Sequence, residues 1–301
     1  MTPDTEGLHP IANADKADRV ADIVFVHGLG GSSHKTWRHG SIGSADHFFW
    51  PEELGNELPQ CGVWSFGYAA GFTQFGNPGM IIEMRAGNLA QQLALAESSP
   101  GVNAGIGKRP LVFITHSMGG LVARSACQHG EDTGQLWRTR LRHLVFLGTP
   151  HHGAPLERGG QWLDRLLGQS LFSAPFAALG QMRSAGITDL RHGNVRDADW
   201  QGRDRFTSAH DHREHLPLPD DVACFSVAAT LAARRGPLAE RLIGDGLVPL
   251  HSALGQHDVA DRDLGLHRHA HWISHGTGHI ELLYRPEVGT QIVNWCLKLR
   301  D

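Results

Sequence analysis

Residues 111–124 read LVFITHSMGGLVAR, and this stretch decides the fold. An apolar run ends in a turn of small residues and a helical pattern begins at once, which predicts a strand, a sharp turn and a helix. A serine at the tip of such a turn, here Ser117, holds its hydroxyl above the sheet. The stretch matches the G-x-S-x-G nucleophile elbow except at Thr115, which stands where the first glycine is usual. The alternative is that Ser117 only caps the helix.

The rest of the chain alternates strand patterns with helix patterns. The strand patterns cover residues 21–26, 61–68, 141–148 and 221–228, and the helix patterns cover 49–58, 81–97, 117–129 and 286–299. Such alternation implies crossover connections, so we predict an α/β fold with a mostly parallel central sheet flanked by helices. In sheets of this kind the active crevice lies beyond the carboxyl ends of the strands. His27, Ser117 and the turn 149–152 all follow strand patterns directly.

Three regions differ in pattern. Residues 1–18 are polar and contain two prolines, which predicts a loose N-terminal arm. Residues 19–154 and 220–301 carry the alternating pattern and form the predicted core. Residues 155–219 break the alternation, and we expect an inserted helical cap or lid over the crevice, with an apolar underside suited to acyl chains. The alternative is an ordinary helical excursion packed on the sheet.

Composition is ordinary for a globular protein. The chain has 301 residues, 41% hydrophobic and 19% charged, with a formal net charge of -4, which gives no support to a nucleic-acid partner. The four cysteines lack metal-type spacing and are expected to be buried free thiols. The N-terminus lacks a secretory-signal pattern and no apolar run reaches transmembrane length. These features predict a soluble, cytoplasmic protein and say nothing of its oligomeric state.

A serine hydroxyl needs an adjacent base, and the base needs an acid that fixes its tautomer. On a strand-turn-helix fold the expected chain order is serine, acid, histidine. Asp245 fits the acid because it lies between two glycines just after a strand region. The alternative for Asp245 is an ordinary turn aspartate. His279, in a flexible turn before the last helix, is the best-placed base, with His275 and then His251 as rivals.

A tetrahedral oxyanion needs two preorganised donors. One is expected to be the Met118 backbone N–H, at the start of the helix that follows Ser117, where the helix dipole adds a favourable contribution. The other is expected to be the Leu29 N–H, in the glycine-rich turn 27–32 after a buried strand. A plain tight turn is the alternative there, and the spacing does not match a phosphate loop. The residues expected to contact substrate at this edge are His27, Gly28, His116 and Thr149.

Histidines are frequent and invite a metal hypothesis. His267, His269 and His271 alternate, so on a strand they would share one face, and a second cluster, His210, His212 and His215, lies in the expected cap. Neither cluster has an acid or cysteine partner at fixed spacing. We therefore predict no metal site and no cofactor.

Five motifs in order carry a family resemblance: residues 26–31 (VHGLGG), 115–120 (THSMGG), 147–153 (LGTPHHG), 244–249 (GDGLVP) and 278–279 (GH). Together they resemble an α/β-hydrolase of the lipase and esterase kind. The chain is most similar to the branch related to GPI inositol-deacylases and phosphatidylglycerol-remodelling serine esterases. The resemblance covers nearly the whole chain from residue 20, apart from the insertion.

The resemblance implies hydrolysis of carboxylic esters, often lipid esters, through Ser117, His279, Asp245 and an acyl-enzyme, without a cofactor. An acyltransferase would use the same triad with an alcohol in place of water. A non-catalytic binding protein of the same fold is the other alternative. The acyl-chain length is not predicted.

Overall fold

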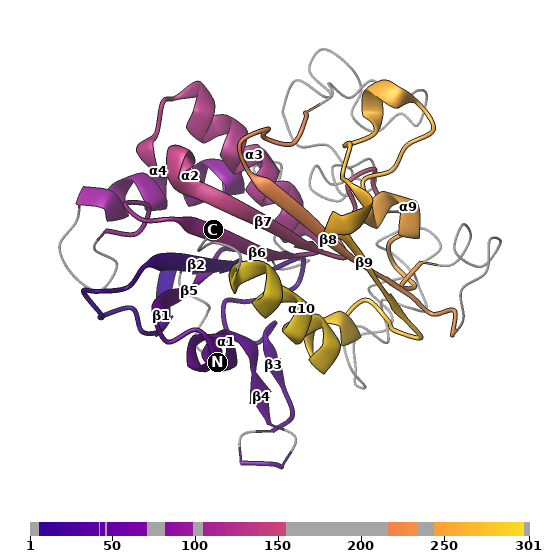
Figure 1. Cartoon of the computed structure of the whole chain (residues 1–301), viewed down its shortest axis with the longest axis horizontal. Helices are drawn as coiled ribbons and strands as arrows, with labels where there is room; N and C mark the ends of the chain where they lie inside the picture. Colours follow the sequence, from indigo (N-terminus) through magenta and orange to yellow (C-terminus); the bar gives the residue numbers. More distant parts are fainter. Residues whose placement is uncertain are drawn as a thin grey trace.

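The computed structural model describes residues 6–41, 43–45, 47–70, 82–98, 105–154, 216–233 and 244–297. At its centre lies a seven-stranded sheet in the order β1-β5-β2-β6-β7-β8-β9 (Figure 1). Only β1 is antiparallel to its neighbour; the other strands run parallel. This confirms the predicted mostly parallel sheet. The strands are β1 (Gly7–Ala12), β2 (Ala21–Val26), β5 (Cys61–Gly67), β6 (Leu111–His116), β7 (Leu141–Leu147), β8 (Ala223–Thr230) and β9 (His271–His275).

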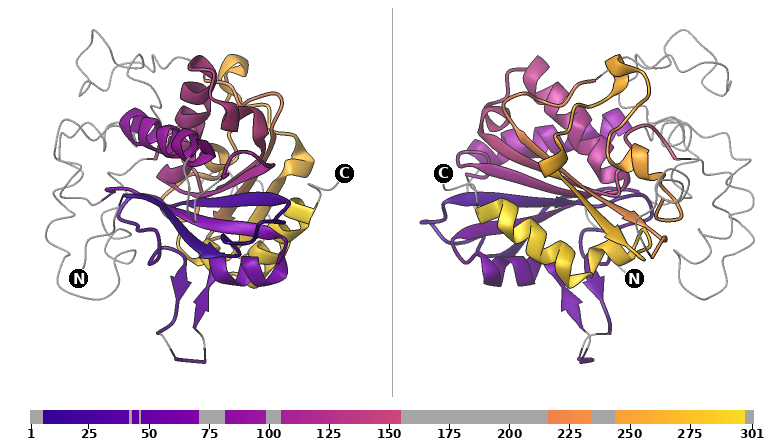
Figure 2. Two further views of the ribbon diagram at one scale, coloured as in Figure 1. Left: turned by 90° about the vertical axis from the view of Figure 1, so that its left-hand side faces the viewer. Right: turned by 45° about the vertical axis from the view of Figure 1, so that its right-hand side comes forward.

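Helices cover both faces of the sheet (Figures 1 and 2). On one face lie α2 (Ile82–Ser98), α3 (Met118–Asp132) and α4 (Leu136–Arg140), and on the other α1 (Trp50–Glu57) and α10 (Pro286–Leu297). Two buried apolar clusters match the two faces. Phe113 of β6 packs in the first and Ile114 in the second, because successive side chains of a strand point to opposite sides. A strand buried on both faces reads as a continuous apolar run, as β6 does.

The remaining described elements are short. They are the paired strands β3 (Arg38–His39) and β4 (Phe48–Phe49), the helix α9 (Leu250–Ala253), and the 3-10 turns η4 (Ala260–Arg262), η5 (Arg268–Ala270) and η6 (Glu281–Leu283). Across the described ranges, every helix is too short or too polar to cross a membrane. All four cysteines are free, as predicted; Cys224 is only partly buried.

The helix patterns predicted the helices well. In α2 the expected apolar stripe, formed by Ile82, Leu89, Leu93 and Ala96, is buried. Pro51 lies in the first turn of α1, where its missing N–H costs nothing. The helical spacing of the apolar residues therefore predicted which face of α2 is buried.

The N-terminal region differs from the prediction. Residues 1–18 were expected to be a loose arm, but Gly7–Ala12 form β1, which pairs with β5 at the edge of the sheet. Leu8 is buried in the apolar cluster under α2, while Pro10 is exposed. A proline is tolerated on an edge strand because one side of that strand needs no ladder donor. Pro10 therefore did not exclude a strand.

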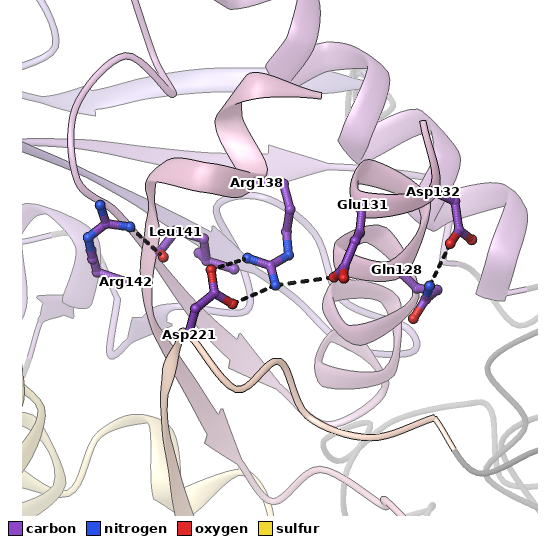
Figure 3. Close-up of polar contacts among 7 residues, drawn as sticks. All are labelled: Gln128, Glu131, Asp132, Arg138, Leu141, Arg142 and Asp221. Atoms are coloured by element: carbon purple, nitrogen blue, oxygen red, sulfur yellow. Dashed lines mark hydrogen bonds and ion pairs between the residues drawn. The ribbon is translucent and has the colours of Figure 1, made fainter. Parts of the chain in front are cut away.

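An arginine holds the chain where it returns to the sheet (Figure 3). Arg138 of α4 donates to both carboxylate oxygens of Asp221, at 2.8 and 3.1 Å, and to Glu131 of α3 at 3.3 Å. The Arg138 hydrogen bond is the main reason that the pKa of Asp221 is lowered. Because Asp221 lies just before β8, this network fixes the start of that strand. Of the predicted cap, residues 155–215 lie outside the described part; Leu216, which follows them, is buried and its carbonyl accepts a hydrogen bond from Arg124 of α3.

Candidate active site

Ser117 lies in the sharp turn between β6 and α3. Its backbone has φ 54° and ψ -128°, a conformation that side-chain-bearing residues rarely adopt. It is the N-cap residue of α3, yet its side chain makes no capping hydrogen bond. The backbone N–H instead donates to the Leu147 carbonyl on β7 at 2.9 Å. The turn thus has the geometry of a nucleophile elbow, and the serine hydroxyl is not used for capping.

Thr115, the departure from the glycine pattern, is fully buried on β6. Its hydroxyl donates to the Val145 carbonyl on β7 at 2.9 Å. The neighbouring strand therefore satisfies the polar atom of the larger side chain, and the elbow forms without a glycine at this position.

Asp245 and His279 form a buried pair. The His279 Nδ1 atom lies 2.6 Å from Asp245 Oδ2, and the two side chains are 3% and 0% exposed. The other carboxylate oxygen, Oδ1, accepts the backbone N–H groups of Leu247 at 2.9 Å and Val248 at 2.7 Å. Asp245 is thus a turn aspartate and also the partner of His279. An ionised carboxylate can only accept hydrogen bonds, so the proton of a neutral His279 lies on Nδ1. The lone pair on Nε2 is then available to accept a proton.

His116 links the loop that carries His279 to the turn that carries Ser117. Its Nε2 atom lies 3.3 Å from the His279 carbonyl oxygen, and the two rings are 4.7 Å apart. Because His116 precedes Ser117, this contact brings His279 beside the elbow. Within the described ranges the buried Nε2 atom of His279 makes no hydrogen bond. Of the two rivals, His275 lies on β9 and His251 is exposed on α9.

The buried His116 ring stays neutral. Burial, and next the charge of His279, hold the pKa of His116 well below its usual value. A neutral ring can place its one proton on Nε2 and donate it to the His279 carbonyl. These contacts indicate that His116 supports the loop that carries His279. A contact between His116 and substrate stays a prediction.

The predicted oxyanion donors flank Ser117. Gly28 packs so closely on the elbow that a Cβ atom there would lie 2.8 Å from the Ser117 Cβ. Leu29 follows Gly28 directly, and Met118 is the first residue of α3. Neither the Leu29 nor the Met118 N–H donates a hydrogen bond to any described residue. The described residues therefore leave both N–H groups unused, and their role as oxyanion donors stays a prediction.

Two of the residues expected to contact substrate are fully buried. Thr149 packs on α3, where a Cβ atom at Gly120 would collide with the threonine side chain. His27 stacks on Tyr68, with ring centroids 4.2 Å apart. Both side chains lie in the interior around the site, and their contact with substrate stays a prediction.

Gly148 is a site residue that the sequence reasoning did not single out. It has φ +56° and follows β7. A Cβ atom there would lie 3.1 Å from His279 Nδ1 and Cε1 and 3.2 Å from Asp245 Oδ2. Only a residue without a side chain leaves the pair undisturbed. The signal in the sequence was a glycine directly after a buried strand.

A Gly148→Ala variant is expected to lower kcat for the reaction at this site by about 10-fold, because small displacements of reacting groups are costly. The added methyl group would push on both members of the Asp245–His279 pair. Gly134→Ala is the matched control, since Gly134 has φ +64° but its Cβ atom would meet nothing within 4 Å. Steady-state kinetics and thermal melting of both variants separate backbone strain from site displacement. Equal kcat values for the two variants would contradict the role given to Gly148.

The alternating histidines do not share one strand. Residues 268–270 form η5, so only His271 lies on β9, and the rings of His267 and His269 stack at 5.3 Å. Within the described residues no group of three potential ligands is arranged to hold a metal ion. The cluster at His210, His212 and His215 lies outside that part of the chain.

Sequence comparisons place the chain near known proteins. A family model described as the PGAP1-like alpha/beta domain matches residues 91–217. The protein SERAC1 of Mus musculus is 27% identical over 167 residues, which are 50% of this chain and 24% of that protein. SERAC1 of Homo sapiens is 28% identical over 167 residues, with the same coverage of 50% and 24%. The chain therefore spans about a quarter of the length of these relatives.

Solved structures give the fold. The mature Bacillus licheniformis lipase BlEst2 superposes with a TM-score of 0.54 at 17% identity, over 99% of both chains. A hyperthermophilic esterase from Pyrobaculum calidifontis gives a TM-score of 0.51 at 14% identity, over 97% of this chain and 86% of its own. With the PGAP1-like match, these likenesses support a serine hydrolase in general. The chain is an α/β-hydrolase-fold protein, similar to the PGAP1-like domain, as its motifs indicated.

Proposed function

We propose that the chain is an esterase or lipase that hydrolyses carboxylic esters with Ser117 as nucleophile, His279 as base and Asp245 as the acid that orients His279. The observation that carries the proposal is the buried 2.6 Å contact between His279 Nδ1 and Asp245 Oδ2 beside a strained serine turn. A turn aspartate without a catalytic role would not need a histidine partner. The fold likeness and the five motifs add support.

The first half-reaction is acylation. The His279 Nε2 atom takes the proton of Ser117 while the serine oxygen attacks the ester carbonyl. Asp245 stabilises the imidazolium that forms, and the N–H groups of Leu29 and Met118 stabilise the tetrahedral oxyanion. When the C–O bond of the ester breaks, His279 returns the proton to the leaving alcohol. The product of this step is an acyl-Ser117 ester.

The second half-reaction is deacylation. His279 takes a proton from a water molecule, whose oxygen attacks the acyl carbonyl. The second tetrahedral intermediate collapses, the carboxylic acid leaves, and the proton returns to Ser117. An acyltransferase would differ only here, with an alcohol in place of water. An assay of the product therefore tests whether water, and not an alcohol, attacks the acyl-enzyme.

Covalent labelling tests the proposal. We expect a fluorophosphonate to label the folded protein once, and peptide mapping by mass spectrometry to place the label on Ser117. Protein unfolded in denaturant is the control, because labelling requires the activated serine. A label on another serine, or equal labelling of folded and unfolded protein, would contradict the assignment.

A rate series defines the substrate. Hydrolysis of p-nitrophenyl esters from acetate to palmitate, with and without a lipid–water interface, separates two cases. A maximum at short chains without interfacial activation identifies an esterase, and a maximum at long chains identifies a lipase. Release of free acid, measured by titration in the presence of an added alcohol, distinguishes hydrolysis from acyl transfer.

A further inference from the structure

Tyr68 touches the turn that carries Leu29. It follows β5, and His27 follows β2, the parallel neighbour of β5 in the sheet. The Tyr68 hydroxyl donates to the His27 carbonyl oxygen at 2.5 Å. The two rings stack at 4.2 Å with an interplanar angle of 8°. The end of one strand thus holds the turn after the next strand by a hydrogen bond and a ring contact.

A second bond strengthens this attachment. The Gly30 N–H donates to the Ala70 carbonyl at 2.7 Å, so the turn is tied to residues 68–70 on both sides of Leu29. On its opposite side the turn meets Ser117, against which Gly28 packs without room for a side chain. Glycines at 28 and 30 would otherwise leave this turn free to rotate. The Leu29 N–H, which makes no hydrogen bond to the described residues, is therefore held in place from both sides.

The Tyr68 hydroxyl is suited to this task. The side chain is buried, at 2% exposure, and burial raises the pKa of the phenol above its usual value. The group therefore stays protonated and remains a donor over the working pH range. A buried tyrosine hydroxyl needs a partner, and the His27 carbonyl is the acceptor that the structure supplies.

We propose that Tyr68 is a positioning residue for the oxyanion donor on Leu29. The inference rests on the proposed function, because it presumes that an oxyanion forms beside Ser117. The Tyr68 bond fixes the peptide unit between His27 and Gly28, and the next peptide unit carries the Leu29 N–H. Tyr68 does not touch the reacting atoms. Its loss should weaken binding of the transition state and leave binding of the substrate unchanged.

The test is a Tyr68→Phe variant, which keeps the ring and removes the hydroxyl. We expect kcat to fall about 10-fold with KM within twofold of the wild type, which is less than the loss from removing an oxyanion donor outright. Affinity for a trifluoromethyl ketone, whose adduct with Ser117 carries an oxyanion, should fall by a similar factor. Tyr284→Phe is the matched control because Tyr284 is the only other tyrosine of the chain. Active-site titration restricts each rate to folded, competent protein.

Several outcomes would overturn the inference. Unchanged kcat and inhibitor affinity in Tyr68→Phe would do so while leaving the proposed function intact. A rise in KM with unchanged kcat would also do so, because it would place Tyr68 in substrate binding. Equal losses of kcat and inhibitor affinity in Tyr68→Phe and Tyr284→Phe would mean that both variants act by lowering the stability of the protein. If the wild-type protein failed to take the fluorophosphonate label on Ser117, the proposed function and this inference would fall together.

Discussion

A Ser117→Ala variant is expected to hydrolyse p-nitrophenyl esters about 10⁶-fold more slowly than the wild type, the loss typical of removing a nucleophile from an intact triad. Without the Ser117 oxygen no acyl-enzyme can form. Residual turnover would come from binding and from the Leu29 and Met118 donors, with water attacking directly. The comparison requires kcat for both proteins on one ester and the absence of a fluorophosphonate label on the variant.

Ser125→Ala is the control for this experiment. Ser125 is a buried serine of the same helix, α3, and takes no part in the site. Its variant should keep wild-type kcat, and thermal melting should show that both variants fold. The Ser117→Ala variant keeps a Cβ atom, so the strain at φ 54° is retained and its melting temperature should stay close to that of the wild type. A Ser117→Ala protein with wild-type turnover would exclude Ser117 as the nucleophile.

The architecture of the site follows from local sequence. The turns that carry His27, Ser117 and Gly148 come after β2, β6 and β7, which are neighbours in the sheet. The loops with Asp245 and His279 come after β8 and β9, the next two strands. Parallel strands end at one edge, so residues far apart in the chain meet there. That arrangement could be predicted for β2, β6, β7 and β8 because their strand patterns are continuous, whereas β9, which precedes His279, has no such pattern and was not predicted.

Contacts between segments could not be predicted in the same way. The importance of Gly148 depends on where His279 and Asp245 lie, and that of Tyr68 depends on a carbonyl in another turn. Neither relation has a fixed spacing in the chain. Likewise nothing in the local sequence indicates that the His116 ring lies against His279. The direction of a side chain at a sharp turn depends on packing, which cannot be predicted from the periodicity of apolar residues in the sequence.

Two local structures have a different cause. β1 contains a proline, a glycine and a histidine, and it forms because the edge of β5 offers pairing partners. On a strand, the alternating His267, His269 and His271 would share one face, but η5 covers residues 268–270. In both places the local pattern was weak, and pairing with the rest of the sheet decided the structure.

An Asp245→Asn variant is expected to fold normally and to lose about 10⁴-fold in kcat. In the wild type, Oδ1 accepts the N–H groups of Leu247 and Val248, so an asparagine must keep its carbonyl oxygen on that side. Its NH₂ group then faces His279 Nδ1 and donates to it, which moves the histidine proton to Nε2. With that tautomer His279 cannot accept the proton of Ser117.

Steady-state kinetics on one ester and fluorophosphonate labelling rates measure the loss for Asp245→Asn. Asp263→Asn is a control from another loop: Asp263 has no part in the site, and it accepts the backbone N–H groups of His257 and Gly265 on different oxygens, so its asparagine variant loses one of these bonds. Far-ultraviolet circular dichroism should match for the two variants, and Asp263→Asn should keep wild-type kcat. Because the proposed loss comes from the tautomer, an Asp245→Asn protein that keeps wild-type kcat would show that Asp245 is only a turn residue, whatever the labelling of Ser117.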